Sequence, residues 1–230
     1  MAASSNEIEW FLKLVDKKSN ELKVHPQLML GTCVYGGFPR DLLRERPPID
    51  YDVMLPSKAV ADAVVKELLG TKKVLELFTS SIMDHPEFST TEYSCRKMVI
   101  ETPFSREMRI DLCYSRATSV GCDSLNFCDF TANNLEIRVD GSISTRIKPW
   151  QIGLSKSYSE SKWLAKCIRD AIEGKLVWMI PDRFSKSMGA NEASRAAFME
   201  KMRVRLMKMQ SKGFVLAEEN ERHLTSFRLE

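Results

Sequence analysis

The stretch GGFPRDLLRERPPIDYDVML, residues 36–55, carries the strongest signal for the fold in this chain of 230 residues. The apolar run at 28–35 predicts a strand that ends at Gly36 and Gly37, where a short helix begins. Glycine lets the backbone approach a ligand closely, and free N–H groups at the start of a helix attract an anion. Residues 49–55 predict a second strand, so a glycine turn and a helix separate two strands.

Two carboxylates lie close together on the second of these strands. Asp50 and Asp52 are two residues apart, so both side chains point to the same face of a sheet. Carboxylates forced together repel one another unless a cation lies between them. A hard divalent cation with oxygen ligands fits this position, and magnesium also bridges the phosphate groups of substrates.

A third carboxylate, Asp111, interrupts the apolar strand predicted at 108–114. An aspartate inside such a strand costs free energy unless it is paired or bound to a metal ion. If this strand lies beside the strand of Asp50 and Asp52, the three carboxylates can hold two metal ions, which suits phosphoryl transfer. The alternative is a structural ion pair between Asp111 and Arg109 or Arg106.

The spacing within residues 36–55 resembles the signature of the head domain shared by poly(A) polymerases and CCA-adding tRNA nucleotidyltransferases, in the nucleotidyltransferase superfamily. That signature runs Gly-Gly-x-Val-Arg-Asp-x-Leu-Leu and then Asp-x-Asp, and Pro39 stands in place of its valine. A second family motif, Arg-Arg-Asp-Phe-Thr-Ile-Asn-Ala-Leu, is similar to CDFTANNL at 128–135. Here Cys128 replaces a phosphate-binding arginine and Asn134 replaces an alanine. The resemblance covers about residues 28–150.

This resemblance implies a metal-dependent transfer of a nucleoside monophosphate from an NTP to a hydroxyl, with release of pyrophosphate and an RNA 3′ end as the expected acceptor. Two Mg²⁺ ions are implied, with Asp50, Asp52 and Asp111 as catalytic metal ligands and Asp111 helping to deprotonate the acceptor hydroxyl. The residues implied to bind or position the nucleotide are Gly36, Gly37, Arg40, Asp41, Asp129 and Asn133.

The pattern of apolar residues along the chain predicts an α+β fold, a mixed sheet with helices on one side, as in the polymerase-beta-like nucleotidyltransferases. Expected helices span residues 5–22, 38–45, 57–69, 155–173 and 190–212, and expected strands span 28–35, 49–55, 73–78, 93–101, 108–114 and 127–139. Asp140-Gly141 predicts a hairpin turn. We therefore expect a head domain at 1–150 and a basic helical region at 151–230, where no family motif is found.

Charge divides the chain at the same place. Residues 1–150 hold 19 Lys and Arg against 21 Asp and Glu, whereas residues 151–230 hold 15 against 10. In the last predicted helix, apolar residues at helical spacing favour packing against a core, with a solvated basic face. The basic residues of that helix that are candidates to contact an RNA backbone are Arg203, Arg205, Lys208 and Lys212.

Composition narrows the class of protein. The chain is 43% hydrophobic and 28% charged, which is typical of a globular domain. Its six cysteines form no C-x-x-C pair, so with three histidines they assemble no zinc motif. We interpret them as reduced, mostly buried thiols of a cytoplasmic protein. No signal peptide is recognised at the start, and no apolar run is long enough to predict a membrane span.

Two alternatives to RNA nucleotidyl transfer remain open. One is a non-catalytic nucleotide- or RNA-binding module on the same fold, acting as a pseudoenzyme or a partner subunit. Cys128 in the arginine position favours it, as does a region after residue 150 that is too short for the family's RNA-measuring domains. The other is transfer of NMP to a protein or a small molecule by a minimal enzyme of the same superfamily.

Overall fold

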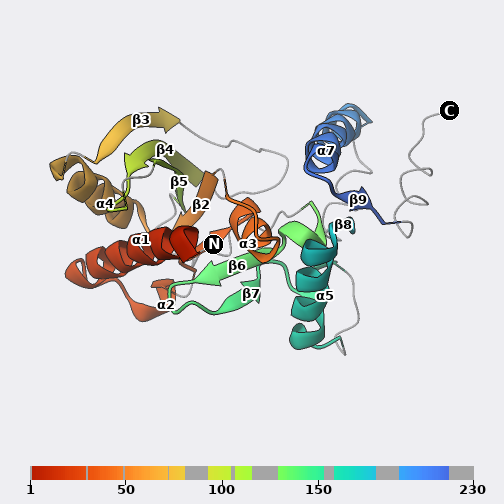
Figure 1. Ribbon diagram of the computed structural model, residues 1–230, viewed down its shortest axis with the longest axis horizontal. Helices are drawn as coiled ribbons and strands as arrows, with labels where there is room; N and C mark the ends of the chain where they lie inside the picture. Colours follow the sequence, from red (N-terminus) through yellow and green to blue (C-terminus); the bar gives the residue numbers. More distant parts are fainter. Residues whose placement is uncertain are drawn as a thin grey trace. The chain divides into compact units, whose positions relative to one another are not determined.

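The structure is a computed structural model that describes residues 2–29, 31–48, 50–71, 73–80, 93–104, 107–115, 129–152, 158–179 and 192–217. The chain divides into two compact units, which we describe separately (Figure 1). The first unit comprises residues 1–126 and 136–144, and the second comprises residues 127–135 and 145–230. No helix in the described part of the chain is long and apolar enough to cross a membrane.

A mixed sheet with the strand order β3-β4-β5-β2-β1-β6-β7 forms the first unit. Its strands are β1 (Cys33–Tyr35), β2 (Asp50–Leu55), β3 (Val74–Ser80), β4 (Tyr93–Glu101), β5 (Glu107–Ser115), β6 (Leu135–Arg138) and β7 (Ile143–Thr145). Strand β2 is parallel to β5 and antiparallel to β1, and β4 is antiparallel to both β3 and β5. Because β2 and β5 are neighbours, residues more than 50 positions apart in sequence meet at the centre of the sheet.

Helices cover one face of this sheet. The helices of this unit are α1 (Ala2–Glu21), α2 (Pro26–Met29), α3 (Gly37–Leu43) and α4 (Lys58–Gly70), of which α1, α3 and α4 contribute buried residues to the core on that face. Helix α4 begins at Ser57, whose side chain accepts a hydrogen bond from the N–H of Val60. Helices α1 and α4 contact one another beside the strands (Figure 1). Their apolar residues form one core with Val53 of β2 and Ile110 of β5, so α1 and α4 pack on the face to which these side chains point.

Strand alternation places the carboxylates on the opposite face. Tyr51, Val53 and Leu55 of β2 are buried in the core beneath α1 and α4. Asp50 and Asp52 alternate with them and therefore point away from that core. The predicted α+β fold, with helices on one side of a mixed sheet, is confirmed for the described residues.

The second unit is mainly helical. Its elements are the 3₁₀ turns η1 (Thr131–Asn133) and η2 (Pro149–Ile152), the helices α5 (Glu160–Glu173) and α7 (Glu192–Ser211), and the short parallel strands β8 (Lys175–Leu176) and β9 (Val215–Leu216). Ser159 caps the start of α5, and Gly174, with φ of +71°, ends it. Trp163 and Cys167 of α5 are buried, and buried Met202 and Met209 of α7 confirm the packing face predicted for the last helix.

Two predicted strands are wrong in part. Among the described residues of the stretch 28–35, only 33–35 form a strand, because Pro26 starts the short helix α2. Of the described residues in the stretch 127–139, only 135–138 lie in a strand, and residues 131–133 form the 3₁₀ turn η1 instead. The predicted Asp140-Gly141 turn is confirmed between β6 and β7, where Gly141 has φ of +81°.

Candidate active site

The site is a row of side chains that crosses the sheet of the first unit. Its members are opposite one another on β4, β5, β2, β1 and β6, and they are Lys97, Asp111, Asp52, Tyr35 and Glu136. Residues directly opposite on neighbouring strands point to the same side of a sheet. Asp52 and Asp111 therefore lie side by side on the face away from α1 and α4. The expectation that their strands are neighbours is confirmed.

Asp50 lies on the same face, two residues before Asp52 on β2. It is exposed at the first position of the strand, and its partner on β5 is Arg109. Asp52 is half-buried, and the side chain of Asp111 is 21% exposed. The two central carboxylates are thus partly withdrawn from water, whereas Asp50 lies at the edge of the site.

Asp111 forms an ion pair with Lys97. The Lys97 Nζ donates to Asp111 Oδ2 over 2.7 Å. The sequence suggested Arg109 or Arg106 as the partner in the structural alternative. Arg109 is in the next row, opposite Asp50, and Arg106 lies outside the described residues. Lys97 was missed because its contact depends on how β4 pairs with β5, which no local pattern shows.

The glycine turn lies against Asp52. Gly36 has φ of +73°, a conformation that side chains other than glycine's rarely adopt. A Cβ atom at Gly36 would stand 2.8 Å from Asp52 Oδ2, and one at Gly37 would stand 3.2 Å from Arg40 Nη2. The backbone of these glycines therefore lies close to the protein's own carboxylate and guanidinium, and its predicted approach to a ligand stays a prediction.

Arg40 and Asp41 form a buried pair in the middle of α3. Arg40 Nε donates to Asp41 Oδ1 over 2.7 Å, and Arg40 Nη2 lies at 2.7 Å from the same oxygen. Burial, with the positive charges of Arg46 and Arg40, lowers the pKa of Arg44 at the end of this helix. The Arg40–Asp41 pair therefore orders the turn beside Gly37, and a contact of either residue with a nucleotide stays a prediction.

A metal site is only partly assembled by the side chains. Among the residues that the structure describes, no group of three or more His, Cys, Asp or Glu lies close enough to hold a metal ion. Asp52 and Asp111 are two adjacent carboxylates with the oxygen ligands that magnesium prefers. The oxygen atoms of these two carboxylates therefore suit a divalent cation. Lys97 already balances one of their two negative charges.

Asp129 and Asn133, expected to position the nucleotide, belong to the second unit. Asp129 is 2% exposed, and its Oδ1 accepts from the N–H of Phe130 at 3.0 Å and from Asn133 Nδ2 at 2.8 Å. Its Oδ2 accepts from Arg205 Nε at 2.5 Å. These contacts hold the turn η1 and tie it to α7, so both residues have a structural role whatever else they bind.

Asn134, which departs from the family motif, has a structural explanation. It is fully buried, its Nδ2 donates to the carbonyl of Ile147 over 2.9 Å, and its Oδ1 accepts from the Ile147 N–H over 2.7 Å. The side-chain amide thus pairs with a backbone amide, as a neighbouring strand would. The alanine of the family motif has no such groups.

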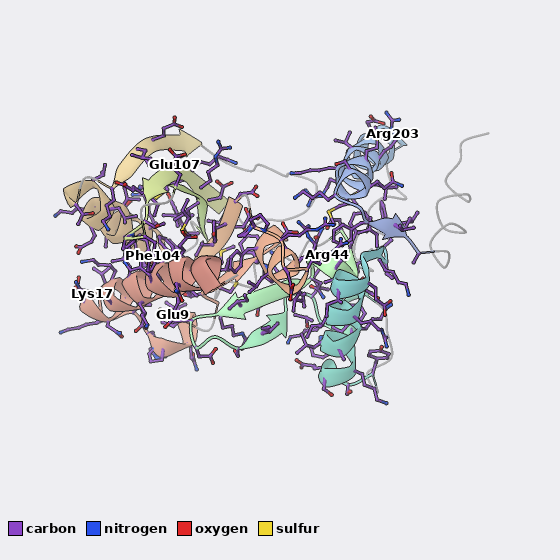
Figure 2. The ribbon with its side chains drawn as sticks, viewed as in Figure 1. Glu9, Lys17, Arg44, Phe104, Glu107 and Arg203 are labelled. Carbon is purple, nitrogen blue, oxygen red and sulfur yellow. The ribbon has the colours of Figure 1, made fainter. Side chains whose placement is uncertain are left out.

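The basic residues of α7 differ in their surroundings. Arg203, which is labelled in Figure 2, is exposed and forms a salt bridge with Glu200. Arg205 contacts Asp129, Lys208 is exposed, and Lys212, which directly follows the end of α7, is half-buried. The contact of any of them with RNA stays a prediction. Outside this helix, the apolar neighbours of Trp150 in the sequence predict a core position for it, but its side chain is 46% exposed.

The cysteines that the structure describes agree with the sequence. Cys33, Cys113 and Cys167 are free thiols and are buried. Cys33 and Cys113 lie with Met54 and Tyr35 in a small apolar cluster on the carboxylate face of the sheet. Along the strands, this cluster is next to Asp52 and Asp111, so apolar side chains lie on one side of the two carboxylates. Cys122 and Cys128 lie outside the described residues.

Several solved structures share this architecture. A CCA-adding enzyme in apo form I aligns with a TM-score of 0.50 and 18% identity, covering 92% of this chain and 40% of that one. Apo form II gives 0.51 and 17%, covering 94% and 43%. A complex of a CCA-adding enzyme with ATP gives 0.53 and 16%, covering 95% and 41%. No family model and no curated protein matches the chain.

These alignments define the class of fold. The chain has the α+β nucleotidyltransferase fold, as the signature at residues 36–55 predicted. Within that class, it is similar to the type found in CCA-adding enzymes. The likeness continues beyond residue 150, where the sequence showed no family motif. The chain spans about two fifths of the length of the structures it matches.

Proposed function

We propose that this chain is a metal-dependent nucleotidyltransferase that transfers NMP from an NTP to a hydroxyl, with an RNA 3′ end as the acceptor. The observation that carries the proposal is the adjacent pair Asp52 and Asp111, which lies beside the turn at Gly36 on the face not covered by α1 and α4. The shared fold supports it, but a fold alone does not establish an activity.

In this reaction the acceptor oxygen forms a bond to the α-phosphorus as the bond to the pyrophosphate oxygen breaks, and pyrophosphate leaves. Asp111 takes the proton of the acceptor hydroxyl. The protein contributes mainly by positioning the reactants and by balancing the charge of the phosphates. The turn at Gly36 and Gly37, ordered by the Arg40–Asp41 pair, provides backbone groups for the triphosphate.

Magnesium would be held by Asp52 and Asp111, with Asp50 as a further ligand at the edge of the site. When bound, it neutralises negative charge on the phosphate oxygens and orients the reacting groups. Two features of the chain position these carboxylates. The glycine turn keeps the Asp52 carboxylate close to the backbone, and β5 places Asp111 directly opposite Asp52.

The nucleotide and RNA partners rest on two observations. One of the similar structures is a CCA-adding enzyme in complex with ATP. In this chain, Arg203 and Lys208 of α7 are exposed and suit contact with a phosphate backbone. We therefore propose an NTP and an RNA as the two substrates.

The test is incorporation of each labelled NTP into a mixture of short RNAs in the presence of Mg²⁺. Asp52→Asn and Asp111→Asn remove one carboxylate charge each at nearly constant volume, and we expect each to lower the rate at least about a hundredfold. Glu9→Gln is the matched control, because Glu9 is an exposed carboxylate that also pairs with a lysine, Lys13, but lies on α1. The proposal fails if no NTP is incorporated, or if Asp52→Asn retains the wild-type rate.

A second candidate is a non-catalytic nucleotide-binding module. The Lys97–Asp111 ion pair favours it, because the lysine balances one carboxylate without any metal ion. Such a module would bind an NTP with an affinity that a metal chelator leaves unchanged, and it would incorporate none. Equilibrium binding of a labelled NTP with and without chelator separates it from the enzyme.

A further inference from the structure

A lysine stands in the row of the paired carboxylates. Lys97 is the β4 residue directly opposite Asp111, and Asp111 is in turn opposite Asp52. The Lys97 Nζ lies 2.7 Å from Asp111 Oδ2. One positive and two negative charges thus follow one another across three neighbouring strands.

This position differs from that of an ordinary surface pair. The Lys97 side chain is half exposed, and exposed ion pairs add little to stability. The Asp111 side chain is only 21% exposed, so its interaction with a cation is less screened by water. Replacing Lys97 should therefore change the affinity of Asp111 for another cation more than it changes the free energy of unfolding.

A divalent cation shared by Asp52 and Asp111 has to compete with this ammonium group. The hydrogen bond from Lys97 uses an oxygen of Asp111 that a metal ion would otherwise bind. The positive charge of Lys97 also repels a second cation at the same carboxylate. A bound triphosphate changes this balance, because its negative charge offsets both the lysine and the metal ion. The ammonium group therefore disfavours the metal alone more strongly than the metal with a nucleotide.

We propose that Lys97 is a positioning residue that holds Asp111 in the free protein and keeps the affinity for a free divalent cation low, so that the metal binds tightly only together with the triphosphate. This inference rests on the proposed function, since it concerns the same carboxylates. It assigns to Lys97 a role that depends on its charge and on its place opposite Asp111.

The experiment is calorimetric titration of the full chain with Mn²⁺, first alone and then with a non-hydrolysable NTP. Lys97→Met removes the charge and keeps the length of the side chain, and we expect it to bind free Mn²⁺ about tenfold more tightly than the wild type. Lys97→Arg keeps the charge and should behave as the wild type. Lys58→Met is the matched control, because Lys58 is an exposed lysine paired with Asp62 on α4.

Three further outcomes separate the possible failures. Unchanged or weaker Mn²⁺ binding by Lys97→Met, or tight binding that persists in the double variant Asp52→Asn/Lys97→Met, overturns the role of Lys97. Equal Mn²⁺ binding by the wild type and Asp52→Asn, with or without nucleotide, overturns the proposed metal site itself. Lys97→Gln is titrated alongside, and circular dichroism shows which variants are folded, so an unfolded Lys97→Met leaves a usable second variant.

Discussion

The backbone of Gly36 and the carboxylate of Asp52 are so close that a Cβ atom on Gly36 would stand 2.8 Å from Asp52 Oδ2. Gly36 also has φ of +73°, so a side chain there is disfavoured by the backbone as well as by its neighbour. The turn that begins α3 and the strand that carries Asp52 are therefore fitted to one another. Any change at Gly36 should act on the position of this carboxylate.

We predict that Gly36→Ala removes most of the proposed activity and leaves the fold intact. The added methyl group must displace the Asp52 carboxylate or the turn, and the strained backbone should lower the free energy of unfolding by about 1–3 kcal/mol. Urea denaturation measures the stability, and NTP incorporation measures the activity.

Gly70→Ala is the control for this prediction. Gly70 is the last residue of α4, and a Cβ there would meet nothing within 4 Å. Alanine favours a helix over glycine by up to about 1 kcal/mol, so this variant should be as stable as the wild type or slightly more so, with full activity. If Gly36→Ala behaves in the same way as Gly70→Ala, the close approach to Asp52 has no functional importance.

The elements that were predicted correctly are those that depend on local spacing. Asp50 and Asp52 share a face because a strand alternates, and the helix predicted at 57–69 forms as α4 because an apolar helical pattern follows Ser57, its cap. The pairing of Asp52 with Asp111 needed one further assumption, that β2 and β5 are neighbours, and the structure bears it out.

The contacts that escaped prediction join residues that are far apart in sequence or depend on strand register. Lys97 is 14 residues from Asp111, and Arg205 is 76 residues from Asp129. In the stretch 127–139, β-like composition favoured one long strand. The side chain of Asp129 instead binds the N–H of the next residue and a nearby amide, which favours the turn η1.

We predict that Asn134→Ala, which restores the residue of the family motif, destabilises the second unit by about 2–4 kcal/mol. It removes two hydrogen bonds to Ile147, leaves a buried N–H without its acceptor, and opens a small cavity. Thermal or urea unfolding followed by tryptophan fluorescence measures the loss, since Trp163 also donates to the Ile147 carbonyl. A stability equal to that of the wild type would contradict this account of Asn134.

We predict that Arg205→Ala lowers stability by about 1–3 kcal/mol, because it leaves the buried carboxylate of Asp129 without its charged partner. Half of the Arg205 side chain is exposed, so the cost should stay below that of a fully buried pair. Arg203→Ala is the control, because the ion pair between Arg203 and Glu200 is exposed to solvent. This variant should change stability by less than about 0.5 kcal/mol. Equal effects of the two variants in urea denaturation would show that the Asp129 contact adds nothing.

The thiol of Cys167 should make the protein less stable at alkaline pH. Burial in the core raises the pKa of Cys167 to about 12, from an ordinary value of 9.0. Between these two values the unfolded chain loses the thiol proton and the folded chain keeps it. Because the folded state then binds more protons, the free energy of unfolding falls as pH rises, by at most about 1.4 kcal/mol per pH unit.

Cys167→Ala isolates this contribution from lysines and tyrosines that titrate in the same range. The difference in unfolding free energy between wild type and variant should be constant below about pH 8. From about pH 9 upward, the wild type should lose stability relative to Cys167→Ala. Urea denaturation at closely spaced pH values measures it. The same burial predicts that iodoacetamide leaves Cys167 unmodified in the folded protein at pH 8 and modifies it in urea, because the thiolate is the reactive form. Parallel stability curves together with rapid modification of the folded protein would mean that this thiol is accessible to water and ionises as an ordinary cysteine does.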